Sequence, residues 1–310
     1  MKKLKIAGLT ALTLLGSLAT SQAQATTAAV GYVTLASVAN PIPASTDVLL
    51  SVPMEASVNF TGLAAATPSP VTSNELAITG ATFTVNEFAP LTGGYYLRLK
   101  SGPSAGQTAE ITSNTANTIT VAHDTGDNFA NVDSSTQLEI VKYFTLSTFF
   151  PSTLPAGTQV SFYGNNTAGI SLAPESIIVW TGSIWFNTSS TPPAAVDATL
   201  YPGEAFMLRT GATALTDLVI TGNVPTLSHR FKMTSLDNNQ QDFALSYLSP
   251  VDEVIGNSGL GFTAGDQLYA FDRSAGIDKA PSSILVYTGS TWLNTSVSPP
   301  VNVTTTFNLE

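Results

Sequence analysis

One stretch of this chain occurs twice, and the duplication constrains the fold more than any other feature. Residues 176–193 read SIIVWTGSIWFNTSSTPP and residues 283–300 read SILVYTGSTWLNTSVSPP, with 12 of 18 positions identical and no gap. In each copy, β-branched and aromatic residues flank a Thr-Gly-Ser turn, which is typical of a β-hairpin. The central glycine can take the positive φ that a tight turn requires. We therefore predict two equivalent β-hairpins.

The similarity continues upstream of both hairpins. The triplet Ala-Gly-Ile at 168–170 recurs at 275–277, and AGTQV at 156–160 matches AGDQL at 264–268. Further back, DVLLSVP beginning at Asp47 loosely resembles DFALSYLSP beginning at Asp242. Short apolar segments at intervals of about ten residues, separated by Gly, Pro and Asn, favour a sandwich or barrel. We predict an all-β protein with two copies of a sandwich- or barrel-like β-unit.

The two predicted units differ in their boundaries. The first unit covers 26–63 and 145–222 and is interrupted at 64–144 by an inserted β-meander, which resembles a small module of many bacterial and phage surface proteins and implies no activity. The second unit, 223–310, stops where the first continues through a Pro-Gly turn into a further strand. We expect the second unit to lack its closing strand. A strand donated by another copy is one route to self-association, because open sheet edges are normally paired or capped.

The first residues are typical of a secretory signal peptide. Lys2, Lys3 and Lys5 precede an apolar segment at 6–18 that is too short to span a bilayer, and Ala23-Gln24-Ala25 has the form of a cleavage site. We predict removal of residues 1–25, with cleavage after the second or first of these alanines. The expected location is secreted, extracellular or on the outer cell surface, without an integral membrane span. A retained anchor is the alternative.

The composition excludes several classes of partner. The chain has no cysteine, so it forms neither a disulfide nor a thiolate metal site. Loss of residues 1–25 would remove three lysines and no acid, which takes the net charge from −10 to about −13. An acidic chain is poorly suited to nucleic acid or anionic lipid. The partners we expect are a surface or matrix polymer or other copies of the chain.

Several motifs follow one another in a fixed order. They are AVGYVTL at 29–35, LLSVPM at 49–54, SGPSAGQ at 101–107, the first Trp hairpin, and LYPGEAFMLR at 200–209. Together they resemble an uncharacterised family of secreted β-rich repeat proteins from Verrucomicrobia-type bacteria, over nearly all of the mature chain. The resemblance implies a secreted location and a β-rich fold, and it implies no mechanism. The sequence departs from that pattern at its C-terminus, where the final strand is absent.

The hairpin aromatics are the strongest candidates for a binding site. Trp180 and Trp185 in the first copy correspond to Tyr287 and Trp292 in the second. Aromatic faces on a rigid sheet can stack on sugar rings. Repeated aromatic pairs on a hairpin are more typical of cross-strand packing, which is the interpretation we favour. If the indole rings of the first pair are buried, the carbohydrate-binding alternative loses its basis.

The loop at 123–135 is the most acidic stretch of the chain. Asp124, Asp127 and Asp133 could together supply oxygen ligands for calcium. The loop lacks the spacing of an EF-hand, so a solvated loop is favoured and no cofactor is expected, with calcium as the alternative. The two histidines, His123 and His229, are far apart and outside any zinc-binding motif.

Catalysis has weaker support. Glu175, Glu204, Asp266 and Asp272 could act as paired carboxylates of a glycan hydrolase, although nothing in their spacing requires it. The sequence therefore predicts a secreted, non-enzymatic structural or adhesion component. The alternatives are a carbohydrate-binding module and, more weakly, a glycan hydrolase. A cleft in which acids and a histidine converge would contradict the non-enzymatic prediction.

Overall fold

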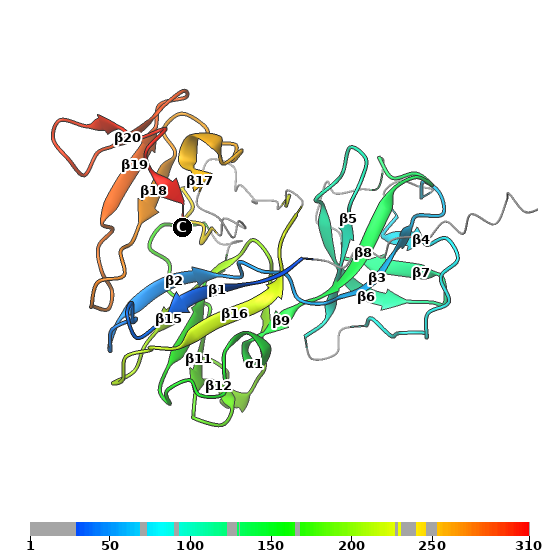
Figure 1. The fold of residues 1–310 in the computed structure, drawn as a ribbon, viewed down its shortest axis with the longest axis horizontal. Coiled ribbons are helices and arrows are strands. Elements are labelled where there is room, and N and C mark those ends of the chain that lie inside the picture. Colours follow the sequence, from blue (N-terminus) through cyan, green and yellow to red (C-terminus); the bar gives the residue numbers. More distant parts are fainter. Residues whose placement is uncertain are drawn as a thin grey trace, which may run out of the picture.

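The computed structural model describes residues 29–68, 73–89, 93–122, 129, 131–164, 168–226, 229–230, 240–245 and 253–309. The prediction of an all-β protein is confirmed, because almost all regular structure consists of antiparallel strands (Figure 1). Among these residues the exceptions are a single helical turn, α1 (Leu146–Phe149), and one 3-10 turn, η1 (Ile255–Asn257). None of the sheets closes into a barrel.

The first unit is built on a six-stranded antiparallel sheet with a two-stranded ribbon packed over it. The sheet has the order β13-β12-β11-β10-β15-β2, formed by β2 (Asp47–Ser51), β10 (Gln159–Phe162), β11 (Ser176–Trp180), β12 (Trp185–Asn187), β13 (Ala194–Ala195) and β15 (Ala205–Arg209). The ribbon pairs β1 (Val30–Ala36) with β16 (Leu218–Asn223), and β9 (Phe144–Thr145) pairs with β14 (Thr199–Leu200).

The inserted domain is a second six-stranded antiparallel sheet. Its order is β3-β8-β5-β6-β7-β4, formed by β3 (Val58–Leu63), β4 (Glu75–Ala77), β5 (Tyr95–Leu99), β6 (Thr108–Asn114), β7 (Thr118–Val121) and β8 (Gln137–Lys142). It has its own core, centred on side chains such as Leu97, Ile111 and Ile140. Figure 1 shows it set apart from the rest of the molecule.

One predicted boundary of the insertion was wrong, and the alternating segment TFTV at 82–85 forms no strand. The strand β3 was assigned to the first unit, but it pairs with β8, so the inserted domain begins near Val58 instead of Ala64. Within 82–85, Phe83 turns its ring edge-on between Phe60 and Phe88, and its N–H donates to a loop carbonyl, that of Ala116.

The region after residue 253 contains a four-stranded sheet with the order β18-β19-β20-β21. Its strands are β18 (Gln267–Ala270), β19 (Ser283–Tyr287), β20 (Trp292–Asn294) and β21 (Val301–Asn302), and β17 (Glu253–Val254) pairs with β22 (Asn308–Leu309). The pairing matches that of β10 to β13. Trp180 lies opposite Trp185, and Tyr287 lies opposite Trp292. Each turn glycine, Gly182 and Gly289, has a positive φ, of 99° and 96°.

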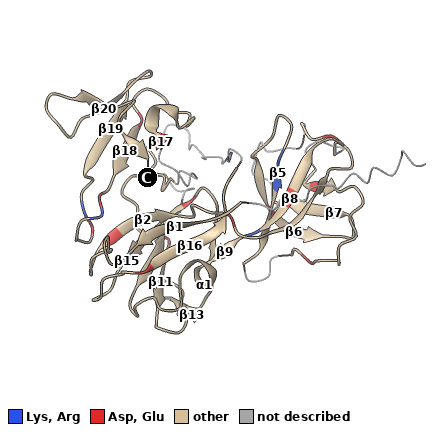
Figure 2. Cartoon of the chain, viewed as in Figure 1, with Lys and Arg blue, Asp and Glu red and all other residues tan. Residues whose placement is uncertain are grey.

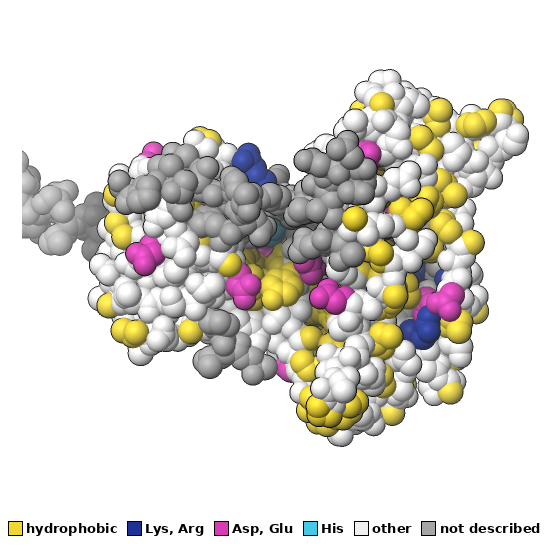
Figure 3. All heavy atoms as spheres, turned by 180° about the vertical axis from the view of Figure 1, so that it is seen from behind, with side chains coloured by type: hydrophobic (Ala, Val, Ile, Leu, Met, Phe, Trp, Pro, Cys, Tyr) yellow, Lys and Arg dark blue, Asp and Glu magenta, His cyan; other side chains and the backbone are white. Residues whose placement is uncertain are grey.

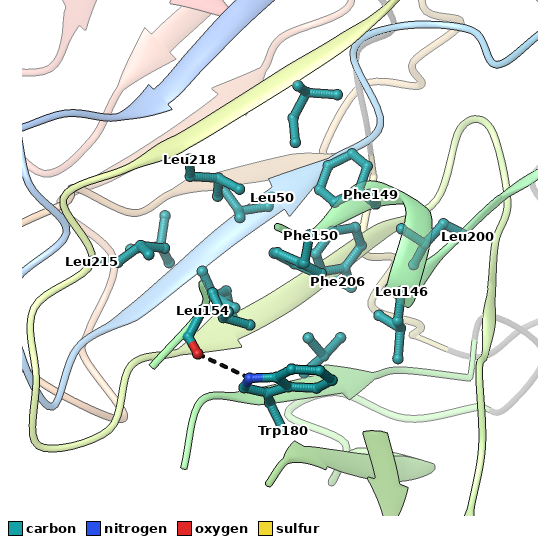
Figure 4. Close-up of a cluster of buried hydrophobic side chains, with 14 of the residues drawn as sticks. Leu50, Leu146, Phe149, Phe150, Leu154, Trp180, Leu200, Phe206, Leu215 and Leu218 are labelled. Atoms are coloured by element: carbon teal, nitrogen blue, oxygen red, sulfur yellow. Dashed lines mark hydrogen bonds between the residues drawn. The ribbon is translucent and has the colours of Figure 1, made fainter. Parts of the chain in front are cut away.

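The cores of the two equivalent regions differ in size. In the first unit, a large cluster of aliphatic and aromatic side chains fills the space between the sheet, the ribbon and α1 (Figure 4). The region after residue 253 has three buried side chains, Ile255, Leu285 and Trp292, and a rim of half-buried ones. In the described part of the chain, no helix has the length and apolar character needed to cross a membrane.

Candidate functional site

The first-copy tryptophans belong to the core. Trp180 and Trp185 expose 7 % and 3 % of their surface, and their ring centroids lie 5.3 Å apart. The indole Nε1 of Trp180 donates a hydrogen bond of 2.9 Å to the carbonyl of Leu154 (Figure 4), which satisfies its polar group. Phe150 packs on the other tryptophan, with centroids 5.4 Å apart. Neither ring face is open to a sugar.

The second copy repeats this packing. Trp292 is 2 % exposed and meets Phe262 edge-to-face, with ring centroids 4.7 Å apart, and Tyr287 stacks beside it at 5.1 Å. Three of the four candidate rings are therefore buried, and Tyr287 is half-buried against them. The hairpin aromatics therefore do not form an exposed platform for carbohydrate. Cross-strand packing accounts for the repetition.

The predicted calcium loop is described only in part. Asp124 and Asp127 lie outside the described residues. Asp133 is exposed, and its Oδ1 accepts hydrogen bonds from the N–H of Ser135 at 2.8 Å, from the hydroxyl of that serine at 2.6 Å and from the hydroxyl of Thr136 at 3.2 Å. These bonds lower the pKa of Asp133 and close a turn ahead of β8.

The candidate catalytic acids lie in two separate places. Glu175 and Glu204 are close enough in the first unit that, together with partial burial, the charge of the former raises the pKa of the latter. Asp266 and Asp272 flank β18, where their carboxylates accept hydrogen bonds from their own loops. The two pairs are not brought together.

A histidine and two carboxylates do converge at the seam between the inserted domain and the first unit. We call Glu55, Arg98, Glu139 and His229 the Arg98 cluster. Arg98 on β5 bonds Glu55 through Nη1 and, through Nη2, donates to Glu139 Oε2 at 2.5 Å across the ladder to β8. The Nε2 of His229 lies 2.9 Å from Glu55 Oε1. Figure 2 shows charged segments side by side on β5 and β8.

The Arg98 cluster joins three parts of the chain. Glu55 lies between β2 and β3, the arginine and Glu139 belong to the inserted sheet, and His229 follows β16. Beside it, the backbone N–H of Arg230 donates to Gly106, and its side chain donates to the carbonyl of Pro103 at 2.8 Å. The chain leaving the first unit is thus held on the inserted domain.

The electrostatics of the Arg98 cluster favour a fixed ion pair over a catalytic group. Burial raises the pKa of Glu55, but hydrogen bonds from His229 and Arg98 outweigh it and hold that pKa below its ordinary value. Burial lowers the pKa of Arg98, and its bonds to both carboxylates outweigh this and raise it. Both partners therefore stay charged at neutral pH.

Little of the cluster is exposed to solvent. The four side chains each expose 7 % of their surface or less. An open hollow of about 390 Å³ at this seam is lined by Glu55 together with Lys142 and Asn223, and Figure 3 shows this face of the molecule. A general acid or base must reach the substrate within hydrogen-bond distance. The Arg98 cluster therefore has the residue types of a catalytic site, but its side chains expose little surface through which they could reach a substrate.

A second set of polar contacts joins the first unit to the region after residue 240. We call the contacts around Asp47, Arg209 and Asp278 the Asp47 joint. Arg209 donates two hydrogen bonds to Asp47, from Nε at 2.6 Å and from Nη2 at 2.8 Å. Its Nη2 also donates to Asp278 at 2.8 Å. The N–H of Asp278 donates to the Asp47 carboxylate at 2.8 Å, and the N–H of Asp47 donates to Gly276.

The Asp242 joint has the same backbone arrangement with the units exchanged. The N–H of Ser171 donates to the Asp242 carboxylate at 2.6 Å, and the N–H of Asp242 donates to the carbonyl of Gly169 at 3.1 Å. Gly169 and Gly276 have φ values of 135° and 141°, and Ser171 and Asp278 have 55° and 49°. The loop at 168–170 thus holds Asp242 and the loop at 275–277 holds Asp47, through equivalent backbone contacts.

The two joints were not predicted from the sequence, although each had a signal. The recurrence of Ala-Gly-Ile and the loose match between the segments beginning at Asp47 and Asp242 marked the residues of the two joints. Nothing in the sequence connected these loops to these aspartates. The Arg98 cluster had no local signal, because its members are dispersed between residues 55 and 229.

The Asp47 joint predicts an acid-sensitive fold. Burial raises the pKa of Asp47, but Arg209 and the N–H of Asp278 outweigh it and hold that pKa below its ordinary value. The stabilisation is complete above the ordinary pKa and is lost as the pH falls through the lowered one. In urea unfolding at a series of pH values, we expect Asp47→Asn to flatten the decline in stability between about pH 5 and pH 2. An unchanged decline would contradict the assignment.

Comparison with known proteins gives no family for this chain: no protein-family model, no curated protein and no solved structure matches it.

Proposed function

We propose that this protein is a non-enzymatic structural or adhesion component of the outer cell surface or extracellular matrix. The observation that carries the proposal is where its buried charged residues lie. The Arg98 cluster and the Asp47 joint sit between modules, and in each an arginine that is paired within its own sheet also binds an acid of the neighbouring module, Glu55 or Asp278. Residues used in this way hold a scaffold in one shape. The same residue types in an enzyme would face a substrate.

The aromatic residues support the same proposal. The hairpin tryptophans and the phenylalanines around them pack in the core, so they stabilise the sheets. What remains for contact with a partner is the set of loops at the ends of the sheets, and loops on a rigid scaffold commonly carry recognition. Weak contacts at several loops would add up to firm attachment when many copies lie on one surface.

Export is the part of this proposal that is most directly tested. We expect the protein, carrying a C-terminal tag, to appear in the medium or on the outer surface without residues 1–25. Replacing Leu14 and Leu15 by arginine should retain it inside the cell, because charges in the apolar segment prevent its recognition. The isoleucine pair at the same positions is the matched control. An intact N-terminus in the cytoplasmic fraction would refute export.

Adhesion is tested separately. Cells that lack the protein should lose attachment or matrix mass, and externally added mature protein should restore it. A mature protein that instead hydrolyses a panel of glycans would replace the proposal with the hydrolase alternative, and retention by a glycan array would favour a carbohydrate-binding role at another surface.

A further inference from the structure

Among the residues that the structure describes, no strand covers the outer edge of β18, whereas the equivalent edge in the first unit is covered. There, β10 is paired on one side with β11 and on the other with β15. The register of β18 on β19 matches that of β10 on β11, so that Gln267, Leu268 and Tyr269 correspond to Gln159, Val160 and Ser161. Within the described part of the chain, β18 pairs with β19 alone.

Part of the backbone of β18 faces away from β19. The carbonyl of Asp266 accepts a hydrogen bond from Tyr287, the last residue of β19, and the carbonyl of Ala270 accepts one from Ser282, which precedes that strand. Because pairing groups alternate along an antiparallel strand, those of Gln267 and Tyr269 face the outer edge. The sequence of β18, QLYA, contains no proline, lysine or arginine, the residues that usually block an exposed edge.

The side chains beside this edge are left partly uncovered. Leu268 is half-buried, while its counterpart Val160 is fully buried beneath β15. Tyr269 and Phe271 are 43 % and 45 % exposed. In the first unit, Phe206 and Leu208 of β15 are buried against β10 and complete the core, which the region after residue 253 lacks.

The charges at the two joints point to the occupant. Asp47 is held by a loop N–H and also by Arg209, the last residue of β15. Asp242 is held by the equivalent loop N–H of Ser171, is exposed, and meets no basic side chain among the residues that the structure describes. A strand of the β15 pattern entering beside β18 would bring its arginine to this aspartate.

We propose that the edge of β18 is a receptor for one extended strand with the pattern F-x-L-R of β15. Its phenylalanine and leucine cover Leu268 and complete the small core, and its arginine pairs with Asp242. Strand addition of this kind takes affinity from main-chain hydrogen bonds and specificity from alternate side chains. The inference concerns a binding site and holds independently of where the protein acts.

A peptide from the chain itself provides the probe. Residues 198–211, ATLYPGEAFMLRTG, are synthesised with a fluorescent label and titrated into mature protein while anisotropy is followed. We expect saturable binding of one peptide per chain. The matched control peptide, with Phe206→Lys and Leu208→Lys, should bind at least about tenfold more weakly, because it keeps the backbone and loses the apolar side chains.

Two variants of the protein test whether the peptide binds at the edge of β18. Tyr269→Pro removes an outward N–H from an edge position where proline is tolerated, so it should abolish binding while the circular dichroism spectrum stays unchanged. Asp242→Lys should weaken binding of the natural peptide, because two positive charges then meet. The same variant should bind a peptide that carries Arg209→Glu, because the charges of the pair are exchanged. Binding that survives both variants would overturn the proposal.

Self-association is a separate outcome. Sedimentation velocity of the protein without peptide shows whether β18 pairs with a second copy instead. A dimer that Tyr269→Pro converts to a monomer, and that does not take up the peptide, would replace the proposed strand with a second copy. A monomer that fails to bind the peptide would refute the receptor altogether.

Discussion

Replacing Arg98 by alanine is expected to destabilise the protein by about 3–5 kcal/mol. The substitution removes the guanidinium that Glu55 and Glu139 share, although both carboxylates stay buried at 6 % exposure. Glu139 keeps Lys100 at 2.6 Å, and Glu55 keeps only the imidazole of His229 at 2.9 Å. An unpaired buried carboxylate is much more costly than the loss of a surface ion pair. Urea unfolding followed by intrinsic fluorescence at pH 7 measures the loss.

The matched control is Arg230→Ala, at the same seam. Arg230 is exposed and its side chain donates to the carbonyl of Pro103, so its loss should cost less than about 1 kcal/mol. A triple variant, Glu55→Gln with Arg98→Met and Glu139→Gln, should recover part of the loss, because it removes the charges along with the arginine. Equal losses for the two arginines would show that the seam is hydrated and weak.

Replacing Trp185 by alanine is expected to cost about 3–5 kcal/mol through the cavity that the indole leaves. Its ring is 3 % exposed and lies between Trp180 and Phe150. The core around it belongs to the large first unit, so the loss should appear in the main unfolding transition. Trp185→Phe retains an aromatic ring and should cost less.

The repeat supplies a comparison within the same molecule. Trp292→Ala removes one of the three buried side chains of the smaller core, so we expect that region to lose protection while the first unit keeps it. Hydrogen exchange read by mass spectrometry distinguishes the two regions. Protection lost equally in both units after either substitution would contradict separate cores.

Local sequence patterns were sufficient for the hairpins. Two apolar segments around Thr-Gly-Ser specify a turn and the alternation of side chains on its strands, so the pairing of Trp180 with Trp185 follows from short-range geometry. The turn glycines adopt the predicted positive φ. The same patterns did not decide which face of the hairpin is covered, and therefore left the burial of the indole rings open.

The pairing of strands that are distant in sequence was harder to predict. The strand β3 has a suitable alternating pattern, yet it pairs with β8, some eighty residues later in the chain, and not with the first unit. Alternation with a period of two residues predicts which side chains share a face of the sheet. It does not predict which neighbouring strand provides the hydrogen-bonding partner. The error in the domain boundary follows from this.

The amino-acid sequence alone determined that this protein is β-rich, that part of it is duplicated, and where its tight turns lie, because these properties depend on neighbours along the chain. The tertiary structure decided that Glu55, Arg98, Glu139 and His229 meet, and that each Ala-Gly-Ile loop holds the other unit's aspartate. Such contacts arise when whole sheets pack and dispersed charges must find partners away from water, and that requirement has no local pattern in the sequence.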